Sequence, residues 1–242
     1  MSGLADRISD WIAAEVAGAG AKGAVVGLSG GIDSAVTAAL CRKALGDSVL
    51  CVIMPCESCR RDEEDAQLVA ASLDVGVVTV CLDEPYAALV RVLPDATPMA
   101  KANLKPRLRM ATLYAYANSL GYMVVGTGNA TELAVGYFTK HGDGGVDLLP
   151  LGNLNKTQVR ELARELGVPR RVIDKPPSAG LWEGQTDEEE LGVGYVELDG
   201  ILAAIDTGDT ECVAPATLDR VRGMMEASAH KRAGRRMCEV IG

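Results

Sequence analysis

The chain has 242 residues, a formal charge of −9 at pH 7 and an isoelectric point near 4.8. A chain of this length can bury roughly 70–75% of the surface that its unfolded form exposes, so we expect one domain over residues 1–242. The acidic charge disfavours a nucleic-acid partner, because binding to phosphodiester backbones requires clustered cations. No apolar run approaches the length of about 18 residues that a membrane span requires, and we expect neither a span nor a signal peptide.

Short β-branched runs alternate with longer segments of helical period, a pattern typical of an α/β protein. It predicts a Rossmann-like domain in which helices flank both faces of a parallel sheet. The predicted strands are residues 23–28, 48–54, 76–82 and 121–126. The predicted helices are residues 4–17, 34–45, 62–73, 107–119, 155–166, 187–204 and 215–232.

Three segments lack a clean period. Residues 83–106 contain four prolines, and we expect no helix there but a mobile stretch. Residues 136–153 and 174–187 are expected to be loops. In an open α/β sheet, the loops beyond the carboxyl ends of the strands build the ligand site.

Residues 23–45 predict a strand, a glycine turn and a helix in immediate succession. Gly30 and Gly31 carry no Cβ, so the turn can fold tightly and bring several N–H groups within reach of a phosphate. Ser29 and Ser34 add hydroxyl groups, and a helix that begins near Ser34 points its positive end at the same place. An ordinary glycine turn is the alternative, but it would not require the two serines.

No lysine follows these glycines, so the loop differs from the G-x-x-x-x-G-K-[ST] loop of many nucleotide hydrolases. Asp33 stands there instead. A carboxylate beside phosphates is repulsive unless a cation lies between them, so Asp33 predicts Mg²⁺. The sequence of residues 29–34 resembles the pyrophosphate loop of enzymes that split ATP between its α and β phosphates to form an adenylate.

Seven cysteines, mostly at apolar positions, are typical of a protein of the reducing cytoplasm, where we expect this chain to reside. Cys56 and Cys59 form a lone C-x-x-C pair. A zinc site would need two further ligands, and the nearby Cys51 and Cys81 lie within apolar, strand-like runs. We therefore expect no metal or redox site at this pair.

Residues 126–132 follow the fourth strand and should open onto the same crevice as the first loop. Thr127 can form a hydrogen bond with a nucleotide there. Glu132 is placed to share a Mg²⁺ ion with Asp33, because two carboxylates together with phosphate oxygens and water suit this ion. The alternative for Glu132 is an acid in the first turn of a helix, where it complements the dipole.

Residues 136–147 combine many glycines with charged side chains, which is typical of a binding loop. Phe138 is the only phenylalanine in the chain and could pack on a flat ring. Lys140 could neutralise a ligand phosphate, and Asp147 could accept hydrogen bonds from ribose hydroxyls. His141 has no partner in the pattern that would orient it as a base.

Residues 155–157 begin the helix 158–166, and Asn155 is a suitable cap for it. We expect the Lys156 ammonium to offset charge on the α-phosphate of ATP as that phosphate is attacked, although a surface lysine is the alternative. Two prolines stiffen residues 175–182, which present Ser178. The acidic residues 188–190 fit the first turn of a helix.

Together these motifs resemble the ammonia-dependent NAD⁺ synthetases, and the resemblance extends from residue 27 to residue 232. GMP synthetases, asparagine synthetases and sulfur-inserting tRNA enzymes share the first motif but not the later ones. The motifs are GLSGGIDS, GTGNATE, GYFTKHGDG, PPSAGLW, QTDEEELG and the terminal HKR.

The resemblance implies that ATP adenylates the nicotinate carboxylate of deamido-NAD⁺ and that ammonia then displaces AMP. It implies Mg²⁺ at Asp33 and Glu132, with Asp33 and Lys156 as catalytic residues. The ATP contacts that it implies are Gly27, Leu28, Ser29, Gly30, Gly31, Ile32, Asp33, Ser34, Thr127, Lys156 and Ser178. The dinucleotide contacts that it implies are Arg107, Lys140, Asp147, His230 and Lys231.

The family more often has alanine where this chain has Pro106, so Arg109 could take the place of Arg107. Family members bind the dinucleotide across a homodimer interface, and the small apolar residues of the segment 110–117 also favour a dimer. The alternative is that this helix is buried within its own subunit.

No Ser-His-Asp or Cys-His arrangement is convincing, and the length leaves no room for a glutaminase, so ammonia is the expected nitrogen source. Two alternative functions remain. A GMP-synthetase-type or thiolating enzyme would bind a purine or tRNA. A nucleotide-sensing module without activity would not need Asp33, Glu132 and Lys156 together.

Overall fold

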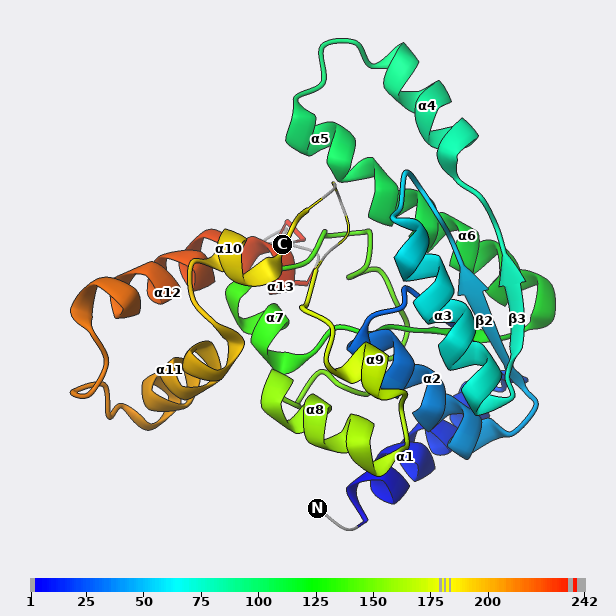
Figure 1. The fold of residues 1–242 in the computed structure, drawn as a ribbon, viewed down its shortest axis with the longest axis horizontal. Helices are drawn as coiled ribbons and strands as arrows, with labels where there is room; N and C mark the ends of the chain where they lie inside the picture. The colour runs from blue at the N-terminus through cyan, green and yellow to red at the C-terminus, as the bar shows by residue number, and fades with distance from the viewer. Residues whose placement is uncertain (1–2, 179, 181, 183, 235–236, 239–242) are drawn as a thin grey trace.

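The computed structural model describes residues 3–178, 180, 182, 184–234 and 237–238. Its centre is a parallel sheet with the strand order β3-β2-β1-β4 (Figure 1). The strands are β1 (Ala24–Gly27), β2 (Val49–Ile53), β3 (Gly76–Thr79) and β4 (Met123–Val125). Val26 of β1 pairs with Cys51 on one side and with Val125 on the other. The predicted fold class and all four predicted strands are confirmed.

Helices cover both faces of this sheet and extend beyond it (Figure 1). The first seven are α1 (Leu4–Gly18), α2 (Ile32–Leu45), α3 (Arg60–Leu73), α4 (Asp83–Val92), α5 (Pro98–Ala102), α6 (Leu104–Leu120) and α7 (Ala130–Val135). The remaining six in the described residues are α8 (Lys156–Glu165), α9 (Arg170–Ile173), α10 (Asp187–Leu191), α11 (Tyr195–Thr207), α12 (Pro215–Ala227) and α13 (Ala229–Arg232).

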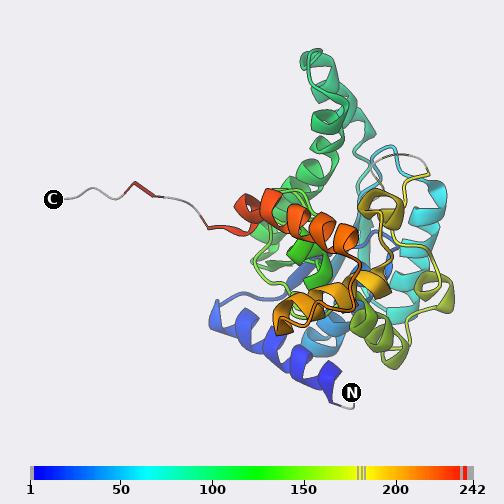
Figure 2. The ribbon, with the colours of Figure 1, turned by 90° about the vertical axis from the view of Figure 1, so that its left-hand side faces the viewer.

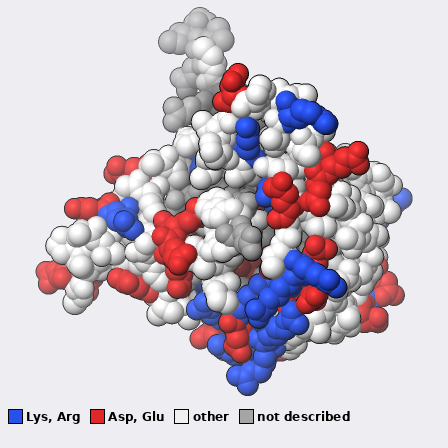
Figure 3. All heavy atoms as spheres, turned by 45° about the horizontal axis from the view of Figure 1, so that its top comes forward, with Lys and Arg blue, Asp and Glu red and all other residues white. Residues whose placement is uncertain are grey.

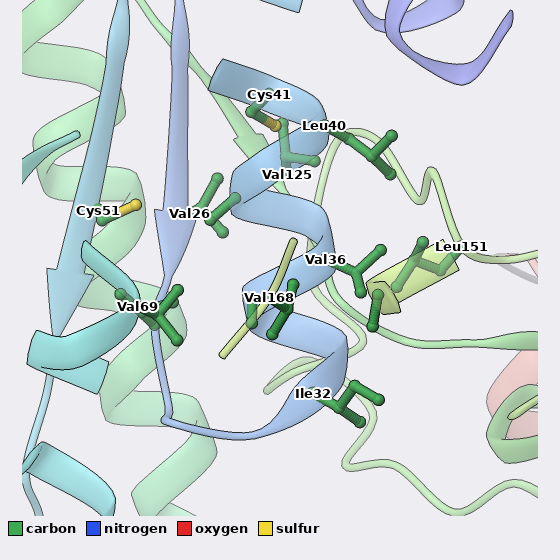
Figure 4. Packing of buried hydrophobic residues seen from close by; sticks show 14 of the residues in the cluster. Val26, Ile32, Val36, Leu40, Cys41, Cys51, Val69, Val125, Leu151 and Val168 are labelled. Carbon is green, nitrogen blue, oxygen red and sulfur yellow. The ribbon is translucent and has the colours of Figure 1, made fainter. Parts of the chain in front are cut away.

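Alternate strand residues face opposite sides of the sheet, because successive side chains of a strand point in opposite directions. On one side, Val26 and Val125 pack against α2. Leu151 belongs to the same buried cluster and lies on the far side of α2 from the sheet (Figure 4). On the other side, Val25 and Val124 pack with residues of α6. Burial on both faces explains why the strands are apolar throughout and do not alternate with polar residues.

A third apolar cluster lies outside the sheet, among α7 and the C-terminal helices on the left of Figure 1. Val135 of α7, Leu198 of α11 and Val221 of α12 are buried in it. This cluster holds α11 beside the first turns of α7 and α8, which carry residues of the site described below. The division of residues 1–242 into one domain remains a prediction.

The expectation that residues 83–106 contain no helix is wrong, because α4, α5 and the start of α6 lie there. Thr97 caps α5 by accepting a hydrogen bond from the Ala100 N–H at 3.2 Å. Pro106 lies in the first turn of α6, where a helix has no internal partner for the N–H that proline lacks. Helices α4 and α5 project away from the body of the molecule (Figure 2).

Two long predicted helices are each divided in the structure, and the prediction of continuous helices is wrong there. Gly192, at a φ of 67°, ends α10 before α11 begins. At the second break, the Ser228 hydroxyl donates a hydrogen bond to the Met224 carbonyl at 2.7 Å. Among the described residues, no helix is long and apolar enough to cross a membrane.

Charge is distributed unevenly over the surface (Figure 3). On the face drawn, Lys and Arg gather in a patch low in the view, and Asp and Glu occupy much of the remaining edge. Exposed pairs such as Lys43 and Asp6, at 2.9 Å, contribute little to stability because water screens them. The ion pairs that bear on function are the buried ones.

Candidate active site

A cavity of about 530 Å³ opens at the carboxyl ends of β1, β2 and β4. The loop after β1 and the loop after β4 both line it, as the sequence predicts for neighbouring parallel strands. Thr127 and Ser178 also line the cavity, and their contacts with ATP remain predictions. Ala179 and Leu181 of the motif around Ser178 lie outside the described residues.

The loop after β1 is a compact turn stabilised by its own serines. The Ser34 hydroxyl donates to the Gly31 carbonyl at 2.9 Å and accepts from the Ser29 N–H at 3.2 Å. Gly30 has a φ of 78°, and a Cβ there would lie 2.2 Å from the Asp62 carbonyl oxygen. Helix α2 begins at Ile32 and its N-cap is a glycine, so its first N–H groups are not capped by that residue's side chain. This arrangement suits a phosphate.

Lys156 brings the two predicted carboxylates together. Its ammonium lies 2.6 Å from Oδ2 of Asp33 and 3.0 Å from Oε1 of Glu132, and its side chain is only 2% exposed. Burial by itself would lower the pKa of Lys156, but the two carboxylates outweigh it and raise that pKa above its usual value. The ammonium is therefore charged, and the alternative of a surface lysine is wrong.

Local capping places Lys156 at this point. The Asn155 side chain accepts a hydrogen bond from the Gln158 N–H at 2.8 Å, and the Gln158 side chain accepts one from the Asn155 N–H at 3.0 Å. Helix α8 therefore begins at Lys156, and the predicted cap at Asn155 is confirmed. The ammonium also lies over the ring of Tyr195, 4.7 Å from its centre, which adds a cation–π contact.

The alternative interpretation of Glu132, an acid in the first turn of a helix, holds in the structure, and its part in a Mg²⁺ site remains a prediction. Its Oε2 accepts a hydrogen bond from the Asn129 N–H at 3.3 Å, which completes a capping box at the start of α7, while its Oε1 contacts Lys156. Asn129 also donates to Oδ1 of Asp33 at 2.9 Å, so it links the two loops. Burial raises the pKa of Glu132 to about 7, against the opposing effect of Lys156.

A buried carboxylate on α11 holds the first turns of α7 and α8 together. Asp199, 8% exposed, accepts hydrogen bonds from the hydroxyls of Thr131 at 2.5 Å and Thr157 at 2.7 Å. Thr131 in turn accepts from the Lys156 N–H at 3.1 Å. Asp199 thus fixes the backbone next to Glu132 and at Lys156. No local sequence signal marks it, because all its partners are distant in the chain.

The side chains of the site can bind Mg²⁺ only if the ion takes further ligands from outside the protein. Asp33 and Glu132 are carboxylates close enough to share one cation, and each is 17% exposed, so both are accessible from the cavity. Among the described residues, no group of three or more His, Cys, Asp or Glu side chains could hold a metal. The donor set therefore suits an ion that takes its other ligands from phosphate oxygens and water.

One of the predicted dinucleotide contacts, Lys231, lines the cavity. Its ammonium donates hydrogen bonds to the carbonyls of Gly136 at 2.7 Å and Phe138 at 2.8 Å and lies over the Phe138 ring. Phe138 lines the cavity as well. The binding loop that the sequence predicts therefore meets the C-terminal helix α13 at the wall of the cavity.

The other predicted dinucleotide contacts are not among the described residues that line this cavity. Arg107 donates to the Lys140 carbonyl at 3.4 Å, and the Lys140 ammonium donates to the His230 carbonyl at 2.6 Å. Asp147 accepts hydrogen bonds from the Tyr114 hydroxyl and from the Val124 N–H, both at 2.8 Å, which is a role in fixing the loop to β4.

Arg109 lines the cavity where Arg107 does not. Its guanidinium donates to the Met54 carbonyl at 3.2 Å and to the Ser58 hydroxyl at 3.3 Å, and burial lowers its pKa. Helical spacing explains the difference, since residues 106, 109, 110 and 113 share the face of α6 that borders the cavity. Within one chain, Arg109 is thus the better placed of the two arginines.

His141, Cys56 and Cys59 do not line the cavity. His141 is exposed, in a turn with a φ of 59°. Cys56 is buried and Cys59 exposed, and neither of the two forms a disulfide.

The fold and the cavity define an α/β nucleotide-binding protein with a pyrophosphate-type loop. A family model described as NAD synthase matches residues 4–234. The chain is 52% identical over 232 residues to an NH(3)-dependent NAD(+) synthetase of Carboxydothermus hydrogenoformans, covering 94% of this chain and 93% of that protein. The chain therefore belongs to the NAD synthase family.

Solved structures agree with this assignment. One described as NMN synthetase from Francisella tularensis is 40% identical, with a TM-score of 0.91 and 98% of both chains covered. Another, described as an NH3-dependent NAD synthetase from Campylobacter jejuni in complex with the nitrate ion, is 29% identical, with a TM-score of 0.86 and 98% of both chains covered.

Proposed function

We propose that the chain is a ligase that forms a C–N bond, converting deamido-NAD⁺, ATP and ammonia into NAD⁺, AMP and pyrophosphate. The observation that carries this proposal is the meeting of Asp33, Glu132 and Lys156 beside a phosphate-type loop, in a chain of the NAD synthase family. A carboxylate activated as an adenylate requires such a centre, because charge develops on the α-phosphate during its transfer.

In the first half-reaction, the nicotinate carboxylate attacks the α-phosphorus of ATP. A new O–P bond forms, the bond between the α-phosphorus and the bridging oxygen breaks, and pyrophosphate leaves. The Lys156 ammonium lies at the edge of the phosphate loop, held by Asp33, and offsets the charge that develops on the α-phosphate. The N–H groups of the loop and of the first turn of α2 hold the departing phosphates.

Asp33 and Glu132 would hold a Mg²⁺ ion against the ATP phosphates. When bound, this ion supplies positive charge that neutralises the phosphates and orients them. Before ATP binds, the Lys156 ammonium neutralises part of the charge of these carboxylates, so they do not repel one another unopposed.

In the second half-reaction, ammonia attacks the carbonyl carbon of the adenylate, AMP leaves, and the nitrogen loses a proton to give the amide. This step needs no covalent intermediate with the enzyme. Catalysis is then a matter of positioning and charge stabilisation.

A second substrate must be compared, because a solved relative is described as an NMN synthetase. That description indicates nicotinate mononucleotide as the alternative acceptor of ammonia. The test compares kcat/KM for deamido-NAD⁺ and nicotinate mononucleotide, with XMP and tRNA in a parallel thermal-shift panel. We expect deamido-NAD⁺ to be preferred, and a preference for the mononucleotide or stabilisation by XMP or tRNA would contradict the proposal.

We predict that the purified chain uses ammonium and not glutamine. The described residues provide no nucleophilic cysteine paired with a histidine, since both histidines are exposed and lie away from the cavity lining. NAD⁺ formation is measured with glutamine while an NADPH-dependent glutamate dehydrogenase with 2-oxoglutarate removes free ammonia, so that the scavenging reaction forms NADP⁺ and not NAD⁺. Ammonium chloride without the scavenger is the positive control. Robust synthesis from glutamine by the pure protein would show that this prediction is wrong.

We also propose that the chain forms a homodimer, in which a second copy would complete the dinucleotide site. Helix α6 buries only one face, at Leu113 and Ala117, and leaves Ala111 and Ala115 exposed. The alternative is that this helix is buried within its own subunit, and the exposure of Ala111 and Ala115 argues against it. The exposed apolar residues of the projecting helices add to this surface and include Leu89, Val92 and Met99.

The dimer predicts a single sedimenting species of twice the chain mass in analytical ultracentrifugation. Ala111→Arg, on the exposed face of α6, should shift this species toward the monomer because the large charged side chain cannot enter a helix contact. The control is Ala203→Arg, on an exposed part of α11 away from α6. A wild-type monomer that is fully active at nanomolar concentration would contradict the proposal.

A further inference from the structure

A second ammonium, that of Lys175, contacts the phosphate loop where the loop meets the start of α3, and Lys175 also lines the cavity. The Lys175 ammonium lies 2.6 Å from Oδ1 of Asp62 and 2.8 Å from Oδ2 of Asp65, and it donates a hydrogen bond to the Gly30 carbonyl at 3.3 Å. The Lys175 side chain is 17% exposed. Sequence patterns gave this lysine no role.

Asp65 receives two cations. Its side chain has no exposure to solvent, its Oδ2 pairs with Lys175, and the Nε of Arg171 lies 2.6 Å from its Oδ1. Lys175 also contacts Asp62 and the backbone of the phosphate loop, whereas the second carboxylate near Arg171 is that of Glu64. Arg171 therefore serves as a comparison for Lys175, because both cations contact Asp65 but only Lys175 contacts the phosphate loop.

The contact between the Lys175 ammonium and the Gly30 carbonyl fixes the direction in which the next N–H group, that of Gly31, points. In a planar trans peptide, the C=O of one residue and the N–H of the next point in opposite directions. The Lys175 ammonium holds the Gly30 carbonyl on the α3 side, so the Gly31 N–H points the other way, toward Oγ of Ser29 at 3.3 Å. That side is the hollow of the loop, where a phosphate would be bound.

The backbone is restricted on both sides of the contact between Lys175 and Gly30. Gly30 lies at a φ of 78° and has no space for a side chain against the start of α3. On the other side, Pro176 and Pro177 restrict the backbone between Lys175 and Ser178, which lines the cavity. Fixing Lys175 thus limits the positions of both the loop and Ser178.

We propose that Lys175 is a positioning residue for ATP, which holds the phosphate loop and the Ser178 segment in their binding geometry through Gly30 and the Asp62–Asp65 pair. The proposal rests on the ATP-binding role of the proposed function. Lys175 acts through the loop backbone, and Lys156 remains the ammonium placed for the α-phosphate.

The test compares Lys175→Met with Arg171→Met, since each removes one cation from Asp65 but only the first releases Gly30. Dissociation constants for ATP with Mg²⁺, for pyrophosphate and for deamido-NAD⁺ are measured by isothermal titration calorimetry, with melting temperatures alongside. We expect Lys175→Met to weaken ATP and pyrophosphate by about tenfold or more, as for one charge-assisted hydrogen bond, and deamido-NAD⁺ by less than about twofold. Arg171→Met should lower the melting temperature similarly but leave ATP affinity within about threefold.

If Lys175→Met does not fold, Asp65→Asn/Lys175→Met is compared with Asp65→Asn, because the asparagine removes the charge that would otherwise be left unpaired. The double variant should again bind ATP about tenfold more weakly than its parent. The proposal would be overturned if Asp65→Asn/Lys175→Met and Asp65→Asn bound ATP equally well. It would also be overturned if Lys175→Met and Arg171→Met lost ATP affinity equally. Failure of the wild-type chain to bind ATP would instead contradict the proposed function.

Discussion

Replacing Lys156 with alanine is expected to lower kcat by about 10²–10³-fold while changing KM for ATP much less. This is the size of effect that follows the loss of one preorganised donor to developing charge. The ammonium is 2% exposed and is held by Asp33 and Glu132, so its position is fixed before the reaction begins. Adenylation precedes attack by ammonia, and the release of pyrophosphate should therefore slow together with the formation of NAD⁺.

Single-turnover quench experiments measure the two half-reactions separately. The control is Lys43→Ala, which removes an exposed lysine that pairs with Asp6 on the surface and should leave both rates unchanged. Loss of Lys156 also leaves two carboxylates without their shared cation, so melting temperatures must accompany the rates. If Lys156→Ala adenylates at the normal rate and stalls only at amide formation, Lys156 belongs to the second half-reaction and the role assigned to it is wrong.

Asp33→Asn should lower turnover by about 100-fold or more at ordinary Mg²⁺ concentrations, with partial recovery as Mg²⁺ is raised. Changes to groups that merely orient metal ligands typically cost about 10–100-fold, and loss of a ligand should cost no less. Asparagine keeps the shape of the side chain, so the contact with Asn129 and the start of α2 can persist. The measurement is the Mg²⁺ dependence of kcat and of the KM for ATP.

Asp47→Asn is the matched control, because Asp47 lies just after the same helix, is exposed and pairs only with Arg42 among the ion pairs of the described residues. It should show wild-type kinetics at every Mg²⁺ concentration. Unchanged kinetics in Asp33→Asn would contradict the assignment of Mg²⁺ to this carboxylate.

The sequence was sufficient to predict the relation between the two main loops. Strongly apolar runs identified β1 and β4, and the glycine-rich segments after them had to open at the same edge of a parallel sheet. The contact of Asn129 with Asp33, across the two loops, confirms that expectation. The caps of α7 and α8 were also predictable, because a capping residue lies close in sequence to the N–H group that it satisfies.

Contacts between distant segments could not be predicted in the same way. Asp199 is an unremarkable acid in a helical sequence, yet the packing of α11 brings it to Thr131 and Thr157. Lys175 likewise follows no pattern that points to Gly30. Pairing of this kind depends on how helices pack, which local propensity does not determine.

The structure differs from the sequence-based expectation in two further places, and each difference has a simple physical cause. Proline was taken as a sign of irregular structure in the segment before α6, but Pro98 and Pro106 both lie in first turns, where proline is compatible with a helix. The choice between Arg107 and Arg109 depends on the rotation of α6 about its axis, and a one-residue change in helix start moves the facing side by roughly 100°.

The most direct test of the central claim is an analysis of products by ³¹P nuclear magnetic resonance. The purified chain is incubated with deamido-NAD⁺, ATP, Mg²⁺ and ammonium chloride, and NAD⁺ is measured in parallel with alcohol dehydrogenase. The account predicts NAD⁺, AMP and pyrophosphate in equal amounts, with no AMP when deamido-NAD⁺ is omitted. Formation of ADP and orthophosphate, or amide formation without AMP, would contradict it.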